Sequence, residues 1–258
     1  MPAADLVIQG TVCTVDERQP TAEALAVSDG RILAVGGRSD VEGWIGSTTQ
    51  TLDLGDGCVM PGLVEAHGHP LMEAIVLSDR MVDIRPVTLR DADAVVDAIR
   101  REVATRGADG AYLNGFDPLL QPGVPEPTLA WLDGEAPDTP LVIVHNSGHK
   151  AYFNTAAARR AGLTRETPDP KGAKYGRDAS GDLDGTAEET GAVFSLLSDV
   201  INPGDYPAML HAELARLNRA GLTTCSEMAF DRCSGRCSSR CATTSPCDCA
   251  STRSPTPP

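Results

Sequence analysis

Two histidines separated by a single residue are the side chains of this chain best suited to binding a metal ion. His67 and His69 directly follow residues 63–66, a short apolar run that can form a β-strand. Residues i and i+2 of an extended backbone point to the same side, so both imidazoles can reach one divalent cation. The pattern therefore predicts a divalent-metal site, with zinc-like ions favoured by imidazole nitrogen. The alternative is a pair of solvent-facing turn residues that bind no ion.

Short strands dominate the segment that precedes the histidine pair. Residues 24–27 and 32–35 are apolar runs joined by Ser-Asp-Gly-Arg, a glycine-containing turn typical of a β-hairpin. Two further runs, 6–8 and 12–15, are separated by Gly10. Together these segments predict a small antiparallel sheet, although so few strands rarely form a stable unit alone.

Beyond the histidine pair, apolar strands alternate with amphipathic helices. Thr88 begins a Ser/Thr-x-x-acid sequence, which predicts a capping box, and Gly107 ends the helix that follows. A second helix starts at Asp205 and ends at Gly221, and residues 141–144 form the clearest buried strand. This alternation predicts βαβ units around a parallel sheet, whose carboxyl edge is where barrel enzymes carry their sites.

The C-terminal segment 231–258 follows neither pattern. It contains no Val, Ile, Leu, Met, Phe, Trp or Tyr, yet it holds five of the eight cysteines. A segment with no large side chain to bury cannot offset the entropy lost on ordering it, so we expect disorder. A cysteine-rich zinc or disulfide module is the alternative, but the spacing C-x3-C-x3-C-x5-C-x-C fits no common zinc template.

The charge balance limits the partners of the protein. The chain has 36 acidic and 22 basic residues and a formal net charge of −14, which argues against nucleic acid and anionic membrane as partners. No apolar run approaches the roughly 20 residues of a membrane helix, and the N-terminus lacks the basic start and apolar core of a signal peptide. We therefore expect a soluble, cytoplasmic protein. The sequence leaves its oligomeric state open.

Several linked motifs resemble one enzyme family. The run Gly-Cys-Val-Met-Pro-Gly-Leu-Val-Glu-Ala-His-Gly-His, after a small β-rich segment, resembles the entry to the barrel of the amidohydrolase superfamily. Later segments are similar to the branch called amidohydrolase family 3, which includes N-substituted formamide deformylase-like proteins. These segments are Tyr-Leu-Asn-Gly-Phe-Asp at 112–117, the Ser-Gly-His…Asn segment at 146–154, the glycine-rich stretch 169–189, and Gly-Leu-Thr-Thr at 221–224.

The resemblance implies an α/β fold in two parts. Residues 1–57 would form an N-terminal β-sandwich segment, and residues 58–230 would form about the first half of a (β/α)8 TIM-type barrel. Residues 231–258 would be the disordered tail.

The resemblance also implies a reaction and its residues. A metal-dependent amidohydrolase would use metal-activated water to hydrolyse a carbon–nitrogen bond of a small, non-peptide amide. His67, His69 and Glu189 would be metal ligands, and His149 would contact the substrate. Two alternatives stand for Glu189. The neighbouring Glu188 is the residue that matches the family's glutamate, or the acid at this position only stabilises a helix N-terminus through the helix dipole. For His149, the alternative is a polar residue that orients its loop. The resemblance assigns no residue as the catalytic acid or base.

Two departures from the family pattern affect these expectations. Glu65 stands where the superfamily commonly has Asp. The later strands of the superfamily supply two more histidine ligands and a final aspartate, but no histidine follows His211 here. Two alternatives therefore stand beside the hydrolase: a truncated, catalytically inactive fragment, and a non-enzymatic metal-binding protein. The Arg-rich, Lys-poor composition is typical of GC-rich coding, so a frameshift after Asp231 would explain the tail, and the coding DNA can test this.

Overall fold

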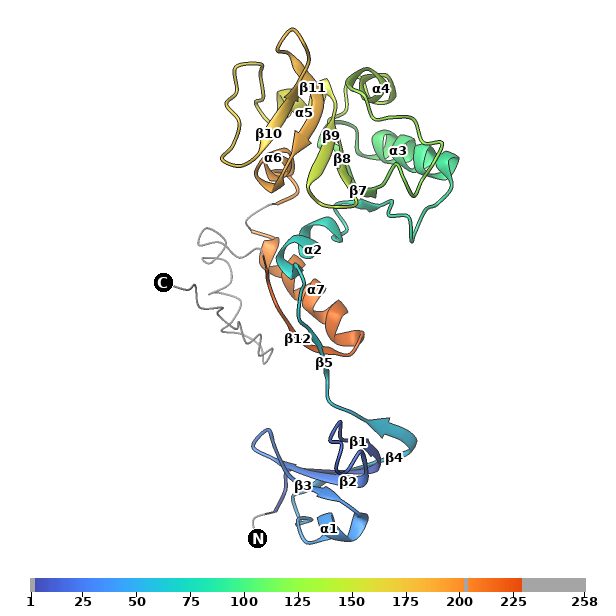
Figure 1. Ribbon diagram of the computed structural model, residues 1–258, viewed down its shortest axis with the longest axis vertical. Coiled ribbons are helices and arrows are strands. Elements are labelled where there is room, and N and C mark those ends of the chain that lie inside the picture. The colour runs from blue at the N-terminus through green and yellow to red at the C-terminus, as the bar shows by residue number, and fades with distance from the viewer. Residues whose placement is uncertain (1–2, 202–203, 229–258) are drawn as a thin grey trace. The chain divides into compact units, whose positions relative to one another are not determined.

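The computed structural model describes residues 3–201 and 204–228 (Figure 1). The C-terminal segment for which the sequence predicts disorder lies outside the described residues. The described chain divides into two compact units. Residues 3–64 with 221–224 form the first unit, and residues 65–220 with 225–228 form the second, apart from the gap at 202–203. Within the described residues, no helix is long and apolar enough to cross a membrane.

The first unit is a four-stranded sheet with one short helix against it. In the order β3-β2-β1-β4, the strands are Arg31–Gly36, Thr21–Ser28, Leu6–Cys13 and Gln50–Val59, and helix α1 is Arg38–Glu42. The expected hairpin is confirmed, because β2 and β3 pair antiparallel around Asp29 and Gly30, which both have positive φ. Val7 and Val41 are fully buried in its small core.

Two expectations for this sheet are wrong. The runs 6–8 and 12–15 are not two strands, because β1 continues through Gly10, whose φ of 137° accompanies a register shift against both neighbouring strands. The sheet is also not purely antiparallel, since β4 lies parallel to β1. The hairpin and α1 lie between these two strands in the sequence, which makes the connection long enough to bring β4 back in the same direction.

The second unit is built on a six-stranded sheet. In the order β10-β11-β9-β8-β7-β6, the strands are Lys174–Arg177, Leu183–Glu188, Lys150–Phe153, Leu141–His145, Ala111–Phe116 and Val82–Asp83. Strands β6, β7 and β8 are parallel and are connected through α3 (Ala92–Arg106) and α4 (Leu129–Glu135), which confirms the predicted βαβ pattern there. Strands β9, β11 and β10 pair antiparallel with their neighbours. Only four residues join β8 to β9, which is too few for the crossover that a parallel strand would need.

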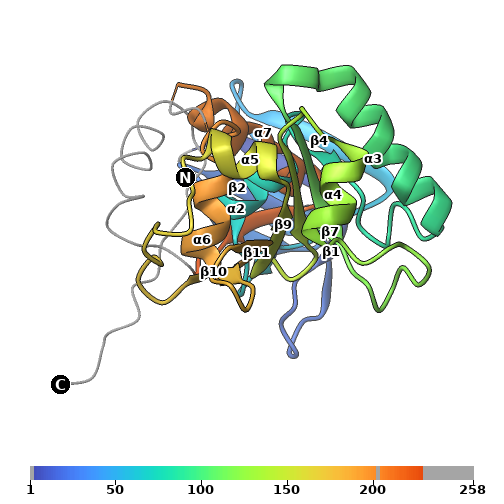
Figure 2. The ribbon, with the colours of Figure 1, turned by 90° about the horizontal axis from the view of Figure 1, so that it is seen from above.

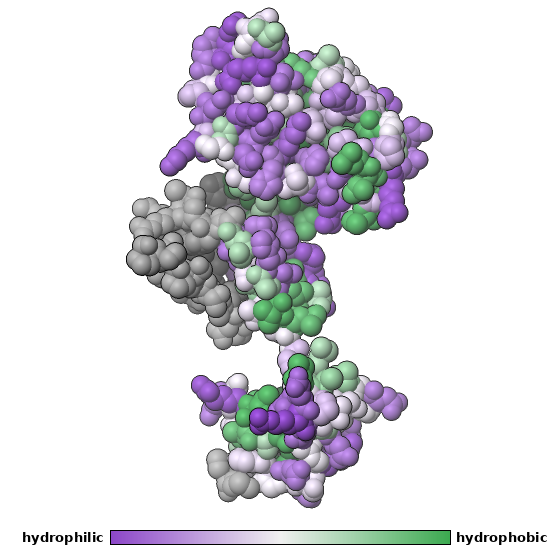
Figure 3. All heavy atoms as spheres, in the orientation of Figure 1, coloured by the Kyte–Doolittle hydropathy of each residue, from purple (hydrophilic) through white to green (hydrophobic). Residues whose placement is uncertain are grey.

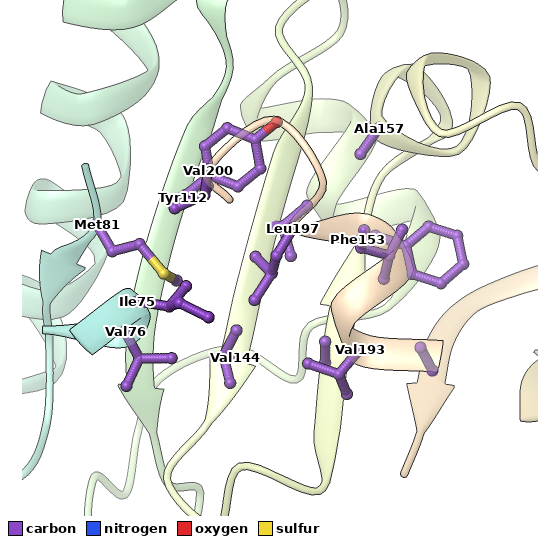
Figure 4. Packing of buried hydrophobic residues seen from close by; sticks show 14 of the residues in the cluster. Ile75, Val76, Met81, Tyr112, Val144, Phe153, Ala157, Val193, Leu197 and Val200 are labelled. Carbon is purple, nitrogen blue, oxygen red and sulfur yellow. The ribbon is translucent and has the colours of Figure 1, made fainter. Parts of the chain in front are cut away.

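Alternate residues of the central strands enter two hydrophobic cores on opposite faces of the sheet. Leu141 and Ile143 pack into the core below α3 and α4, whereas Val142 and Val144 pack into the core with α2 (Pro70–Val76), α5 (Thr155–Arg160), α6 (Thr190–Leu196) and α7 (Tyr206–Arg219). Figure 2 shows α3 and α4 on one side of the strands and α5 and α6 on the other, and Figure 4 shows Val144 among its neighbours in the second core. Burial on both faces explains why 141–144 is a continuous apolar run.

Helix boundaries follow the sequence signals in part. Helix α7 begins after Asp205 and ends before Gly221, as predicted. The capping box at Thr88 is wrong: Asp91 caps α3, its carboxylate accepting the Ala94 N–H, whereas the Thr88 hydroxyl donates to Asp83 at 2.9 Å. Mostly hydrophilic residues occupy the visible face of the second unit, with smaller apolar areas among them (Figure 3).

Candidate functional site

The structure brings His67 and His69 together at the end of β5 (Leu63–Glu65). Their ring centroids are 5.6 Å apart and the rings are nearly perpendicular, at 88°. The carboxylate of Glu65 accepts the backbone N–H of His67 at 3.0 Å, so this acid, a departure from the family's usual Asp, holds the turn that carries both rings. His69 is the N-cap residue of α2, and Pro70 at the first helical position fixes where the helix starts.

Glu227 lies next to His69, a contact that the sequence did not indicate. One carboxylate oxygen accepts the Leu71 N–H at 2.9 Å, and the other lies 3.5 Å from Nδ1 of His69. The backbone after β12 (Leu222–Cys225) reaches this position because Ser226 N–H donates to Glu65 and Met228 N–H donates to Gly68. No local sequence signal links Glu227 to a histidine more than 150 residues earlier.

The donor set around the histidine pair fits a divalent cation only in part. Two imidazoles with a carboxylate behind one of them match the way proteins usually orient zinc-binding histidines. A catalytic zinc site uses three protein ligands, however, and among the described residues no group of three or more His, Cys, Asp or Glu side chains could hold a metal ion. His67 and His69 therefore fit two ligand positions and do not complete a site.

His149 and Glu189 form a second pair in the same unit. Nδ1 of His149 lies 2.9 Å from a carboxylate oxygen of Glu189, and the Glu189 N–H donates to the His149 carbonyl at 2.7 Å. Their side chains are 63% and 55% exposed, so a ligand can reach both. Neighbouring Glu188 instead pairs with Lys174 at 3.0 Å. The Glu189 side chain makes no cap hydrogen bond to α6, although Glu189 is the N-cap residue.

Glu189 has a strained backbone. Its φ of 68° and ψ of 155° lie in a region that is essentially restricted to glycine and costs other residues on the order of 1–3 kcal/mol. Such strain is concentrated at functional sites, where the surrounding structure holds the residue in place. The conformation orients the carboxylate of Glu189 toward His149.

We expect Glu189→Gly to stabilise the protein by about 1 kcal/mol, because relief of the strain exceeds the small value of an exposed hydrogen-bonded pair. The matched variant Glu188→Gly should instead cost about 1 kcal/mol, since it puts glycine at the last position of β11 and removes the Lys174 pair. Urea unfolding of both variants measures the two free energies. Equal destabilisation by the two variants would show that Glu189 stores no strain.

A fourth histidine, His145, is the last residue of β8. Nδ1 of His145 accepts the Ser147 N–H at 3.0 Å and lies 3.0 Å from the Ser147 hydroxyl, which in turn accepts the His149 N–H. Burial lowers the pKa of His145, with smaller effects from Asp117 (raising) and Lys150 (lowering). These side chains lie at the carboxyl ends of β7 and β8, the edge of a parallel sheet that carries binding sites in related architectures. His211 is an exposed residue of α7.

Comparison with known proteins identifies the family. The model of the amidohydrolase family called Amidohydro_3 matches residues 50–242. The chain is 32% identical over 190 residues to N-substituted formamide deformylase of Arthrobacter pascens, covering 72% of this chain and 34% of that protein. It is 30% identical over 203 residues to protein LONG AFTER FAR-RED 3 of Arabidopsis thaliana, covering 77% of this chain and 32% of that protein. The chain thus spans about a third of the length of these relatives.

A solved structure shares the fold. The crystal structure of an uncharacterized metal-dependent hydrolase from Pyrococcus horikoshii OT3 superposes with a TM-score of 0.64 at 19% identity, covering 91% of this chain and 45% of that one. The resemblance based on the histidine motif and the later segments is confirmed by the match of the family model over most of the chain. The chain therefore belongs to the amidohydrolase family, in its family 3 branch.

Proposed function

We propose that this protein acts as a metal-dependent amidohydrolase on the carbon–nitrogen bond of a small amide other than a peptide. The observation that carries the proposal is the placement of His67 and His69 side by side after β5, with Glu227 behind His69. Family membership and the formamide deformylase among its relatives support the reaction class. A fold shared with a metal-dependent hydrolase agrees with it.

The histidine pair has a defined part in this proposal. Glu227 lies next to Nδ1 of His69, which leaves Nε2 as the ligand atom, and Glu65 holds the turn at His67. Zinc is the ion we propose, because imidazole nitrogen favours zinc-like ions. A divalent cation in such a site polarises a carbonyl group and lowers the pKa of a bound water, which is the chemistry that amide hydrolysis needs.

His149 is proposed to contact the substrate. Its Nδ1 faces the Glu189 carboxylate, so Glu189 orients the ring and leaves Nε2 toward solvent. A role of Glu189 as a metal ligand rests on the family resemblance alone. The hydrogen bond favours Glu189 as the residue that positions His149.

The finer architecture is also a proposal. The parallel strands β6, β7 and β8 with their connecting helices support a (β/α)8 TIM-type barrel of which the second unit forms a part. The four-stranded sheet of the first unit agrees with one layer of a β-sandwich.

An assay of amide hydrolysis tests the proposed function. The purified chain with added Zn2+ is incubated with N-benzylformamide, and the released formate and benzylamine are measured. Hydrolysis should release the two products in equal amounts. We expect release that needs Zn2+ and falls to the buffer background in His67→Gln/His69→Gln. The control His211→Gln changes an exposed helix residue and should keep full activity.

Two outcomes would contradict the proposal. Zn2+ binding without any hydrolysis would favour a catalytically inactive family member, consistent with the incomplete ligand set among the described residues. If the chain shows no Zn2+ binding and no hydrolysis, the protein does not act through a metal ion.

A further inference from the structure

A cavity of about 450 Å³ lies in the second unit, at the edge of the sheet opposite His145. Gly110 and Tyr112 line it at the start of β7, whereas Phe116, the last residue of β7, pairs with His145. Six residues of strand span roughly 16–20 Å, so the cavity is separate from the candidate active site. Its volume lies within the usual range for sites that bind small molecules.

Two arginines of the cavity lining are held in fixed orientations. Arg106 donates through Nε to Glu102 at 2.9 Å and through Nη2 to the Asp79 carbonyl at 3.3 Å. Arg160 pairs with Asp199 and also donates to a backbone carbonyl oxygen. Each guanidinium thus has a carboxylate and a backbone anchor, and the remaining N–H groups can bind a planar carboxylate.

Carboxylates already neutralise the arginines of the lining. Arg80 pairs with Asp205, Arg106 with Glu102 and Arg160 with Asp199. The carboxylates of Asp79 and Asp109 are exposed and make no hydrogen bond or ion pair within 3–201 and 204–228. Two unpaired carboxylates beside guanidinium N–H donors disfavour a polyanion such as phosphate and match a ligand that carries one ammonium and one carboxylate group.

Part of the cavity wall is apolar. Tyr112 and Val200 are 6% and 2% exposed, and Figure 4 shows the two side chains next to each other. Burial and the nearby Asp199 carboxylate raise the pKa of Tyr112 to about 12, so its hydroxyl is neutral and donates toward Asp199 at 3.5 Å. This wall can accept an aliphatic group.

We propose that this cavity binds a small α-amino acid with an aliphatic side chain. Arg106 and Arg160 would bind the carboxylate, Asp79 and Asp109 would bind the ammonium group, and the side chain would contact Tyr112 and Val200. The proposal does not depend on the hydrolase activity, because the cavity shares no residue with the histidine sites.

Three probes of matched shape test the proposal by calorimetric titration of the whole chain. L-leucine has both charged groups, 4-methylpentanoate lacks the ammonium, and 3-methylbutylamine lacks the carboxylate. We expect L-leucine to bind with a millimolar or lower Kd and each analogue to bind at least about tenfold more weakly. No binding of L-leucine at about 10 mM, or equal binding of 4-methylpentanoate, would overturn the proposal.

Substitution of the two unpaired aspartates locates the ligand. Asp79→Asn/Asp109→Asn should weaken L-leucine binding about tenfold and strengthen 4-methylpentanoate binding, since the two carboxylates that attract the ammonium group and repel a ligand carboxylate are then neutral. The control Asp97→Asn/Asp138→Asn removes the same charge from exposed positions outside the cavity and should change neither affinity. Identical effects of the two double variants would place the ligand elsewhere and refute the site. The comparison of the three probes on the unmodified chain decides the question even if a variant folds poorly.

Discussion

Asn154→Ala is expected to lower the free energy of unfolding by at least about 3 kcal/mol. The Asn154 side chain is fully buried, and Oδ1 accepts the N–H groups of Leu141 and Ala157 at 3.0 and 2.8 Å. Its Nδ2 donates to the carbonyls of Ala136 and Thr139 at 2.6 and 2.8 Å. Alanine would leave four backbone groups without this partner, and each unsatisfied buried group costs about 1–3 kcal/mol.

Two further variants separate hydrogen bonding from general disruption. Asn154→Asp keeps the shape and the acceptor Oδ1 but places an oxygen against two carbonyl oxygens, so we expect it to destabilise as strongly as alanine. Asn146→Ala removes an exposed asparagine from the loop after β8 and should change stability by less than about 0.5 kcal/mol. Urea unfolding gives all three values. A loss below about 1 kcal/mol for Asn154→Ala would show that water replaces the side chain.

The largest effect on ligand binding is expected for the histidine pair. His67→Gln/His69→Gln should weaken Zn2+ binding at least about a hundredfold in calorimetric titration, because both imidazole ligands are removed. Glu227→Gln should weaken it by about tenfold, since Glu227 only orients His69. The glutamine variants keep the size of the side chains, and circular dichroism checks the fold.

A third variant distinguishes the histidine pair from the cysteine-rich segment. Deletion of residues 231–258 should leave Zn2+ binding unchanged if His67 and His69 are the ligands. Loss of binding in that deletion, with both histidines intact, would place the metal on cysteines and contradict the assignment. Full affinity in His67→Gln/His69→Gln would do the same.

The sequence predicts elements wherever one local cause determines them. Residues 141–144 are apolar without interruption because β8 is buried on both faces. The Asp29-Gly30 turn forms a hairpin because both positions need positive φ. The same locality explains the errors: Thr88 has the composition of a cap, but its hydroxyl is bound to Asp83, so α3 begins at Asp91 instead.

In the candidate site, too, local sequence determines some features and the tertiary structure determines others. The family and the adjacency of His67 and His69 follow from the sequence, because neighbouring residues of one turn stay close in any fold. The tertiary structure alone places Glu227 behind His69, Glu189 on His149, and the arginines of α3 and α5 around one cavity. These partners lie tens to more than a hundred residues apart, and only the pairing of strands and the packing of helices bring such distant side chains within hydrogen-bonding distance.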